Sequence, residues 1–244
     1  MIHAMCGRYV SPERAAIERA WQVGRGNSNP FGRRTNVLPT TVIPILRADP
    51  GTGALELAEA RWGLIPEWWK QDKPPSYSIN ARSEEAASKP MWRHAWRHSR
   101  CLIPAEGWYE WQAVQQTDPK SGEVRTRKQP HYIFRHDRKP VCFAGLMASW
   151  SGQGDKPVLS CAILTRDASA SLAQVHDRMP VVLPDELLVR WVRADVDKAE
   201  EVASMVKLAQ SNFDHYAVSA RLNSAKSDDP ELIAPIREGE SDPS

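Results

Sequence analysis

Cys6 directly follows a methionine in the stretch Met5-Cys6-Gly7-Arg8. If the residues ahead of it are removed, Cys6 carries a free α-amine beside its thiol, with pKa values of about 7.7–8.0 and about 8.5. Such an amine can attack an aldehyde to give a Schiff base, and the thiol can then close a five-membered thiazolidine. An internal cysteine cannot do this, because its nitrogen is an amide. Taken alone, Cys6 also fits a half-buried cysteine of a first strand.

Two further residues have types suited to moving protons. Glu110 lies among aromatic residues in Trp108-Tyr109-Glu110-Trp111, and a carboxylate in apolar surroundings has a raised pKa and can act as acid and base. His176 precedes Asp177, and histidine, which titrates near pH 6.5, is the usual proton shuttle. Each also has a structural interpretation: Glu110 as an edge-strand glutamate that faces water, and His176 as a turn histidine capped by Asp177.

Polar and aromatic residues outside the strands could bind a polyanion with unpaired bases. Asn80 can donate and accept hydrogen bonds at once, and Arg82 offers a bidentate fork for phosphate. Trp68, Trp69 and Pro39 lie in loops, and exposed aromatic faces stack on unpaired bases for about 1–3 kcal/mol per base. The alternatives are ordinary surface charge for the arginine and a hydrophobic lid for the tryptophans. We expect one tryptophan to stack and the other to pack.

The sequence predicts neither a metal site nor a cofactor. His94 and His98 have the i, i+4 spacing of helical metal ligands, but the glutamate of the H-E-x-x-H pattern and a third ligand are missing. We therefore expect surface histidines. The cysteines show no C-x-x-C spacing. Three of them lie in apolar runs typical of buried thiols: Cys101, Cys142 and Cys161.

Length and charge limit the class of protein. The 244 residues, 41% of them hydrophobic, fit one sizeable domain or two small ones. No run is long and apolar enough to span a membrane, and the start does not resemble a signal peptide, so we expect a monomeric cytoplasmic protein. The net charge of +2 hides an asymmetry, because residues 224–244 hold six acidic and two basic side chains. We expect a disordered acidic tail behind a moderately basic body that suits a polyanion.

The candidate residues must be positioned by a scaffold rich in strands. Apolar patterns and turn residues predict strands at residues 7–10, 41–47, 55–62, 100–103, 108–112, 131–134, 141–147, 158–165 and 216–218. Helices are expected at residues 11–21, with Ser11 as N-cap, and at 81–88, 184–192 and 197–210. The polar stretch 115–128 indicates a long hairpin tip. This pattern favours an α+β fold, a single domain around a mixed or antiparallel, barrel-like β-sheet core with peripheral helices.

The motifs occur in one order along the chain. They are Cys6-Gly7-Arg8, Asn36-Val37-Leu38-Pro39, Arg61-Trp62-Gly63-Leu64-Ile65-Pro66 with Trp68-Trp69, Ile79-Asn80-Ala81-Arg82-Ser83-Glu84, Gly107-Trp108-Tyr109-Glu110-Trp111 and His176-Asp177-Arg178-Met179-Pro180. Over residues 6–223 this set resembles the SOS-response-associated peptidase family, the abasic-site-processing proteins. The resemblance implies a DNA-repair protein that binds single-stranded DNA and captures abasic sites in a covalent thiazolidine crosslink. The same fold has also been proposed to be a thiol autopeptidase that trims the residues ahead of its cysteine.

The resemblance also implies a role for each matched residue. Cys6 would form the crosslink, and Asn80 would pin the Cys6 backbone. Glu110 would hold the Cys6 amine and shuttle protons, while His176 would protonate the sugar ring oxygen and assist reversal of the crosslink. The residues that would contact DNA are Gly7, Arg8, Pro39, Trp68, Trp69, Arg82 and Arg178. No cofactor is implied, and the partner would be single-stranded DNA that contains abasic sites.

The sequence departs from the family at its start. Members begin Met-Cys, whereas Met1-Ile2-His3-Ala4 precede Met5 here. We expect residues 1–5 to be an extension that is absent or removed in the active form, ahead of a catalytic and DNA-binding domain at residues 6–223. Two other functions stay open at this point: a thiol peptidase or amidohydrolase with Cys6 as nucleophile, and a non-covalent module for single-stranded DNA.

Overall fold

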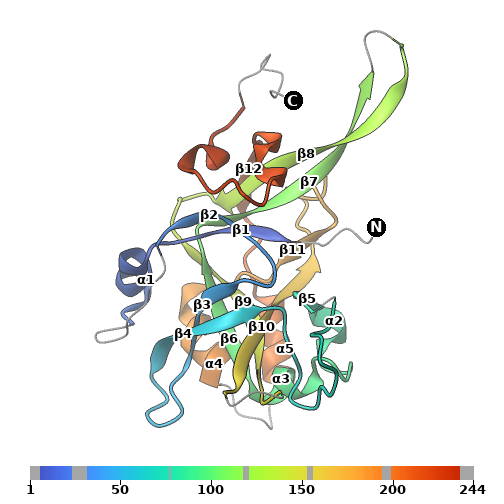
Figure 1. Cartoon of the computed structure of the whole chain (residues 1–244). Helices are drawn as coiled ribbons and strands as arrows, with labels where there is room; N and C mark the ends of the chain where they lie inside the picture. Colours follow the sequence, from blue (N-terminus) through green and yellow to red (C-terminus); the bar gives the residue numbers. More distant parts are fainter. Residues whose placement is uncertain are drawn as a thin grey trace.

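Two sheets make up the molecule, and the first is an antiparallel five-stranded sheet (Figure 1). The computed structural model describes residues 6–23, 32–76, 78–117, 121–152, 156–193 and 199–236. The strands of the first sheet run in the order β12-β8-β7-β1-β2. Their bounds are β1 Arg8–Ser11, β2 Arg34–Val37, β7 Gly107–Thr117, β8 Val124–Arg135 and β12 Phe213–Ala217. Strands β7 and β8 form a hairpin that projects beyond the body (Figure 1).

The second sheet closes into a mixed barrel. Its strands run in the order β10-β4-β3-β6-β9, and β9 pairs back onto β10. Only the β10–β4 pair within this ring is parallel. The bounds are β3 Val42–Ala48, β4 Leu55–Trp62, β6 Arg100–Ala105, β9 Val141–Trp150 and β10 Val158–Asp167. Two short strands, β5 Asn80–Arg82 and β11 Arg178–Pro180, pair with β10.

Short helices surround the sheets. They are α1 Arg14–Trp21, α2 Ser83–Ala86, α3 Arg93–His98, α4 Leu188–Arg193 and α5 Ala199–Lys207, with 3-10 turns η1 Asp185–Leu187, η2 Ala220–Asn223 and η3 Pro230–Ile233. The arrangement confirms the predicted α+β domain with a barrel-like core. Among the described residues, no helix has the length and apolar character needed to cross a membrane.

A cluster of aromatic rings is buried in a core to which both sheets contribute. Tyr9 of β1 packs edge-on against Trp62 of β4 and Phe143 of β9, with ring centres 5.4 and 6.0 Å apart. Trp108 of β7 contacts the same Phe143 ring at 5.8 Å. Edge-to-face pairs of this kind add to the burial of large apolar side chains. Cys6 lies in this cluster and is fully buried.

The element boundaries depart from the sequence expectation in a few places. Helix α1 begins at Arg14 with Glu13 as its N-cap, because Ser11 still pairs with Arg34 as part of the sheet. The stretch 115–128 is mostly strand, since β7 continues to Thr117 and β8 begins at Val124. Backbone pairing needs no apolar side chains, so a polar ribbon gives no apolar alternation to detect. Strands β2, β5 and β11 and helix α3 were not predicted.

The C-terminal segment corrects another expectation. Leu232 of η3 is fully buried. Asp228 Oδ1 accepts hydrogen bonds from the backbone nitrogens of Thr35 and Asn36 at 2.6 and 3.0 Å. The expected disorder is therefore wrong for residues 224–236, because a carboxylate bound to strand β2 and a buried leucine hold this polar segment. Residues 237–244 and the expected extension at residues 1–5 lie outside the described residues.

Candidate active site

Cys6 lies directly ahead of β1, at the edge where the five-stranded sheet meets the barrel. Its side chain is fully buried, and burial raises the pKa of its thiol, with the nearby Glu110 carboxylate adding to the effect. Its φ of 42° lies in the left-handed region, which costs a residue with a side chain about 1–2 kcal/mol. Strained backbone of this kind concentrates at functional sites.

Glu110 faces Cys6 because β1 pairs with β7. The register sets Arg8 opposite Tyr109, and the backbone nitrogen of Cys6 donates to Glu110 Oε1 at 2.7 Å. The glutamate is 2% exposed. Burial raises its pKa well above the usual range, the hydrogen bond from Cys6 partly offsets this, and Asp177 raises it further. A carboxyl group whose pKa is raised in this way can act as a proton donor as well as a proton acceptor.

His176 completes the group from the loop between β10 and β11. Its Nε2 lies 3.9 Å from Glu110 Oε2. Its Nδ1 accepts the backbone N–H of Arg178 at 3.0 Å, and Asp177 Oδ1 lies 3.0 Å from the same nitrogen. The hydrogen bond from Arg178 thus fixes the ring with Nε2 toward the Glu110 carboxylate. The structure brings Cys6, Glu110 and His176 together from three separate parts of the chain.

Strand β5 carries Asn80 and Arg82 beside the same loop. It pairs in parallel with β10, with Asn80 opposite Ile163 and Arg82 opposite Thr165. Asn80 is half-buried, whereas Arg82 is exposed. Arg82 is therefore accessible to a ligand in solution.

Arg8 contacts protein groups. Its Nη1 donates to Asn36 Oδ1 at 2.9 Å and to the carbonyl oxygen of Leu222 at 3.1 Å. The side chain is half-buried, and burial lowers its pKa. These contacts join β1, β2 and η2 directly behind Cys6.

Arg178 is buried and surrounded by acceptors. Its guanidinium donates to both carboxylate oxygens of Glu84 at 2.9 Å and also contacts Asp167. The carbonyl oxygen of Thr165 accepts a further bond at 3.0 Å. In this structure the arginine fastens β11 to α2 and β10, so a direct phosphate contact would compete with these partners.

The two neighbouring tryptophans differ in their contacts. Trp68 is 52% exposed. Trp69 is half-buried, its indole N–H donates to the carbonyl oxygen of Lys73, and its own carbonyl oxygen accepts from the Trp150 indole at 2.8 Å. Their ring centres are 5.9 Å apart. Of the other expected DNA contacts, Pro39 is half-buried in a turn after β2, and Gly7 is buried beside Cys6.

A polar network next to Glu110 was not predicted from the sequence. Glu110 and His131 are directly opposite each other in the β7–β8 pair. His131 Nε2 and Nδ1 lie 3.1 Å from Gln112 Oε1 and from His215 Nδ1, respectively. Gln174, two residues before His176, contacts His215 Nε2 at 3.2 Å, and its carbonyl oxygen accepts from Gln112 at 3.1 Å. The network ties the histidine loop to the sheet. Only the i, i+2 spacing of Glu110 and Gln112 could have pointed to it.

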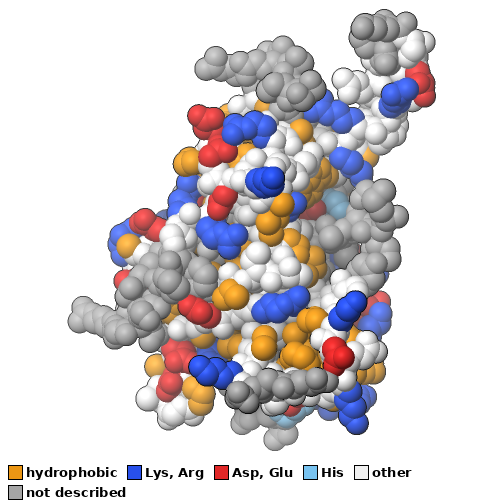
Figure 2. Space-filling model, in the orientation of Figure 1, with side chains coloured by type: hydrophobic (Ala, Val, Ile, Leu, Met, Phe, Trp, Pro, Cys, Tyr) orange, Lys and Arg blue, Asp and Glu red, His pale blue; other side chains and the backbone are white. Residues whose placement is uncertain are grey.

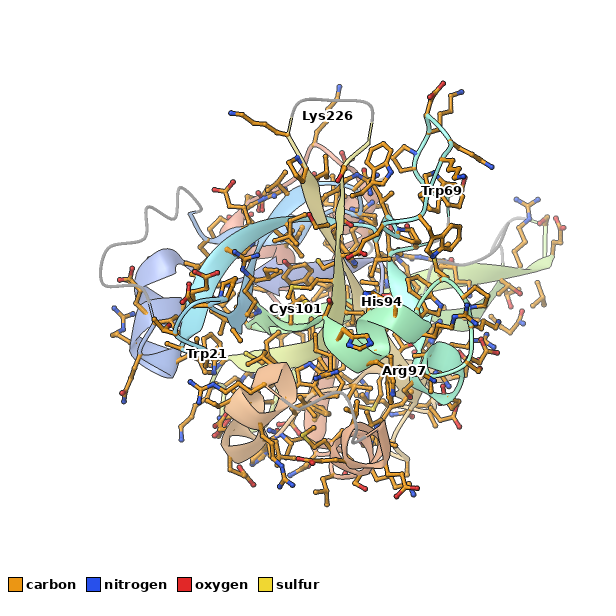
Figure 3. The ribbon with its side chains drawn as sticks, turned by 90° about the horizontal axis from the view of Figure 1, so that it is seen from below. Trp21, Trp69, His94, Arg97, Cys101 and Lys226 are labelled. Carbon is orange, nitrogen blue, oxygen red and sulfur yellow. The ribbon has the colours of Figure 1, made fainter. Side chains whose placement is uncertain are left out.

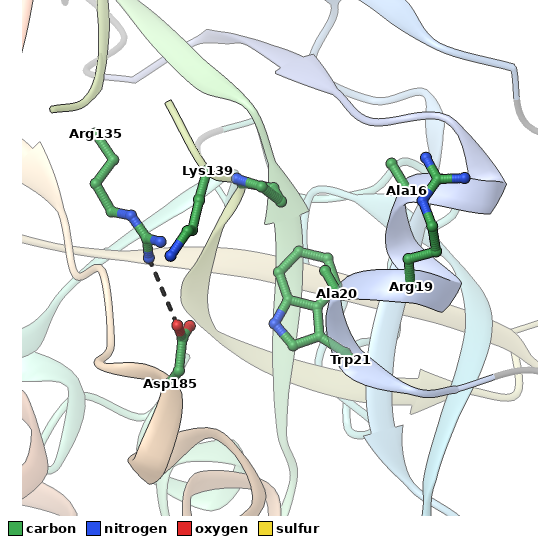
Figure 4. A pocket seen from close by; sticks show the side chains of 8 residues that line it. Ala16, Arg19, Ala20, Trp21, Arg135, Lys139 and Asp185 are labelled. Atoms are coloured by element: carbon green, nitrogen blue, oxygen red, sulfur yellow. Dashed lines mark ion pairs between the residues drawn. The ribbon is translucent and has the colours of Figure 1, made fainter. Parts of the chain in front are cut away.

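Two other features lie apart from Cys6. A hollow of 360 Å³ is lined by Arg19, Trp21, Arg135, Lys139 and other residues (Figure 4), and an ion pair joins Arg135 to Asp185 inside it. His94 lies on α3 (Figure 3), and both it and His98 are exposed, as expected. Within the described ranges, no group of three or more His, Cys, Asp or Glu could hold a metal ion.

Comparison with known proteins identifies similar sequences. The profile of the family described as SOS response associated peptidase (SRAP) matches residues 5–225. The abasic site processing protein YedK of Escherichia coli is 34% identical over 209 residues, which span 85% of this chain and 86% of that protein. The abasic site processing protein YoqW of Bacillus subtilis is 34% identical over 199 residues, 81% of this chain and 84% of its relative.

Solved structures share the fold. A protein from Bacteroides thetaiotaomicron superposes with a TM-score of 0.76 at 21% identity, covering 96% of this chain and 100% of the other. A phage-related protein from Bordetella bronchiseptica gives a TM-score of 0.64 at 32% identity, covering 87% and 94%. The likeness at 21% identity concerns the fold alone.

Proposed function

We propose that this chain, which belongs to the SOS response associated peptidase family, captures abasic sites in single-stranded DNA through Cys6 once its α-amine is free. One observation carries the proposal. The Cys6 nitrogen lies 2.7 Å from one Glu110 oxygen, and the other oxygen lies 3.9 Å from His176 Nε2. The atom that would attack an aldehyde thus has a proton acceptor beside it, with a second proton carrier one step away.

The reaction balances without an oxidant or reductant. A proton from His176 to the sugar ring oxygen favours the open-chain aldehyde. The Cys6 amine adds to the aldehyde carbon, Glu110 relays the amine proton toward the departing oxygen, and water leaves to give an imine. The Cys6 sulfur then bonds to the imine carbon, and the thiol proton passes to the imine nitrogen. The sum is one aldehyde and one aminothiol converted to one thiazolidine and one water.

The pKa directions suit this order of events. Burial raises the pKa of the Cys6 thiol, which keeps it protonated and favours the amine as the first nucleophile. Burial also raises the pKa of Glu110, so the same carboxyl group can accept a proton from the amine and return one to the leaving water.

The surroundings support a DNA ligand. The exposed face of Trp68 suits stacking on a base, and the exposed Arg82 suits a phosphate. We assign Arg8 and Arg178 chiefly to positioning, since their guanidinium groups bind protein acceptors behind Cys6 and at β11. Two relatives that match most of this chain are named as abasic site processing proteins, which agrees with this ligand.

The test is adduct formation by Cys6→Ser. Protein that begins at Cys6 should form a heat-stable adduct with an abasic strand, without reductant. Cys6→Ser should form one only when borohydride traps the imine, because the amine remains and the ring-closing sulfur is gone. Cys142→Ser, a matched change at a buried thiol in the barrel, should behave like wild type. A heat-stable adduct of Cys6→Ser without reductant would refute the thiazolidine.

A second activity, removal of the residues ahead of Cys6, is favoured by the left-handed φ of 42° at that residue. An N-terminal residue has no φ torsion, so cleavage of the Met5–Cys6 bond would relieve the strain. The Cys6 thiol would pass its proton to Glu110 as the sulfur attacks the Met5 carbonyl carbon, and the C–N bond would break as Glu110 gives that proton to the amine. Water would then hydrolyse the thioester, releasing the Met5 carboxylate and restoring the thiol. Purified wild type should lose residues 1–5 while Cys6→Ala retains them. Retention by both would reject self-cleavage.

A further inference from the structure

The hairpin of β7 and β8 extends further than the packing of the domain requires. The two strands pair from Trp108 and Ile133 out to Thr117 and Val124. The third strand, β12, pairs only with residues 131–135 of β8. Beyond that point the side chains are mostly exposed, so the outer part is a two-stranded ribbon. Such a ribbon is marginally stable alone in water, and its length suggests a surface used for binding.

The two faces of the ribbon can be told apart by contacts at its base. Successive side chains of a strand point to opposite faces. Gln112 contacts Gln174 in the His176 loop, whereas the indole of Trp111 donates to Asn223 of η2 at 2.9 Å. The face with Gln112 is therefore continuous with Glu110 and the active site. We call it the site face, made of Gln112, Val114 and Gln116 of β7 and Gln129, Arg127 and Arg125 of β8.

Both faces of the outer hairpin carry basic side chains, two arginines on the site face and one lysine on the outer face. The register sets Arg127 opposite Val114 and Arg125 opposite Gln116, both on the site face. Lys128 lies on the outer face, opposite Ala113. Glu123 at the tip is an acidic neighbour and pairs with Arg125 at 2.7 Å. Figure 2 shows Lys and Arg side chains along the projecting hairpin and over the neighbouring body.

The distances from Glu110 to the arginines of the site face fit a nucleic-acid strand that extends outward from the active site. At about 3.3 Å per residue, Val114 lies roughly 13 Å and Gln116 roughly 20 Å along the strand from Glu110. An extended single strand that starts at the lesion would pass their partners Arg127 and Arg125 a few nucleotides away. Gln116, which is exposed on the site face, also has an amide that can donate to a phosphate oxygen.

We propose that the site face of the β7–β8 hairpin binds the phosphate backbone of single-stranded DNA a few nucleotides to one side of the abasic site. The proposal rests on the proposed function for the location of the lesion. It adds a second contact region, so the footprint on DNA would be longer than the active site alone needs. Polyanions gain affinity through release of counterions at each neutralised phosphate.

Neighbouring residues on opposite faces give a matched pair of variants. Arg127→Ala and Lys128→Ala each remove one positive charge from adjacent positions of β8. Affinity for a long single strand of about 16 nucleotides is measured by fluorescence anisotropy over a range of salt concentrations. Arg127→Ala should reduce the slope of log affinity against log salt by about 0.7, the value for one phosphate contact on single strands. Lys128→Ala should keep the wild-type slope.

A short abasic trinucleotide separates this surface from the active site. On it, Arg127→Ala should form adduct as wild type does, because the hairpin is out of reach. Equal slopes for Arg127→Ala and Lys128→Ala on the long strand would overturn the proposal. If wild type formed no adduct on either strand while the slope difference persisted, the crosslinking function would fail and the hairpin surface would stand.

Discussion

The reaction centre and the surface around it are built in opposite ways. Cys6 and Glu110 are 0% and 2% exposed, and the backbone N–H of Cys6 donates to the Glu110 carboxylate. Trp68 is 52% exposed in a loop. Groups that transfer protons gain shifted pKa values from burial, whereas groups that bind a polymer must stay accessible to it. The difference suggests that chemistry and affinity can be altered separately in this protein.

The largest effect should come from the buried centre. Glu110→Gln keeps the shape and a hydrogen-bond acceptor for Cys6 but cannot relay protons. Positioned proton transfer is worth about 10²–10⁴-fold in rate, so adduct formation by protein beginning at Cys6 should slow by about that factor, with little change in DNA affinity. Glu106→Gln, the same change at a partly exposed glutamate paired with Arg33, is the control. A wild-type rate for Glu110→Gln would remove it from the mechanism.

We expect the C-terminal segment to contribute to the stability of the domain more than to the electrostatics of DNA binding. Truncation after Asn223 removes the buried Leu232 and the Asp228 carboxylate that binds β2. Losing one buried leucine and these hydrogen bonds should lower the free energy of unfolding by about 3–6 kcal/mol. Truncation after Ile236 keeps both and should leave stability unchanged. Urea unfolding measures the free energy of unfolding of the two truncated proteins. Equal values would show that residues 224–236 contribute nothing to stability.

Variants of Trp68 and Trp69 test whether exposed and half-buried aromatic side chains have separate roles in DNA binding and in stability. Trp68→Ala should weaken binding of intact single strands by about 1–3 kcal/mol and leave the melting temperature close to wild type. Trp69→Ala should lower the melting temperature, because it removes the indole that bonds to Lys73. Anisotropy and thermal unfolding together measure both. A reversal of the two phenotypes would assign stacking to Trp69 instead.

A further effect should appear in the pH dependence of stability. Burial and then the neighbouring His215 lower the pKa of His131 to about 4, from about 6.5 in an unfolded chain. Between these values the unfolded state binds more protons than the folded state. The free energy of unfolding should therefore fall as the pH drops from about 6.5 to about 4, with no contribution from His131 above this window.

His131→Gln tests this assignment, because glutamine does not titrate. The variant should show a flatter decline in the same window, measured by urea unfolding at several pH values. His98→Gln, a change at an exposed histidine of α3, should keep the wild-type decline. An identical decline in His131→Gln would show that another group causes it.

Local patterns in the sequence predicted where the strands lie better than which distant residues the fold brings into contact. The aromatic run around Glu110 and the apolar runs of the barrel predicted strands and hence the α+β class, because side-chain patterns are a local property. The contact between Cys6 and Glu110 joins residues 104 apart, and the Arg178–Glu84 pair joins residues 94 apart. No local pattern encodes such pairings, and the resemblance implied a DNA contact for Arg178 where the fold supplies the carboxylates of Glu84 and Asp167. The resemblance to a family, and not periodicity, singled out Cys6, Glu110 and His176 together.

The central claim is that the Cys6 nitrogen must be a free amine. Protein that begins at Cys6 and protein that retains Met1 to Met5 are each mixed with an abasic single strand, and intact masses are recorded. We predict that only the first form gains the mass of the strand less one water, because an amide nitrogen cannot form an imine. Equal adduct yields from the two forms would contradict the aminothiol mechanism.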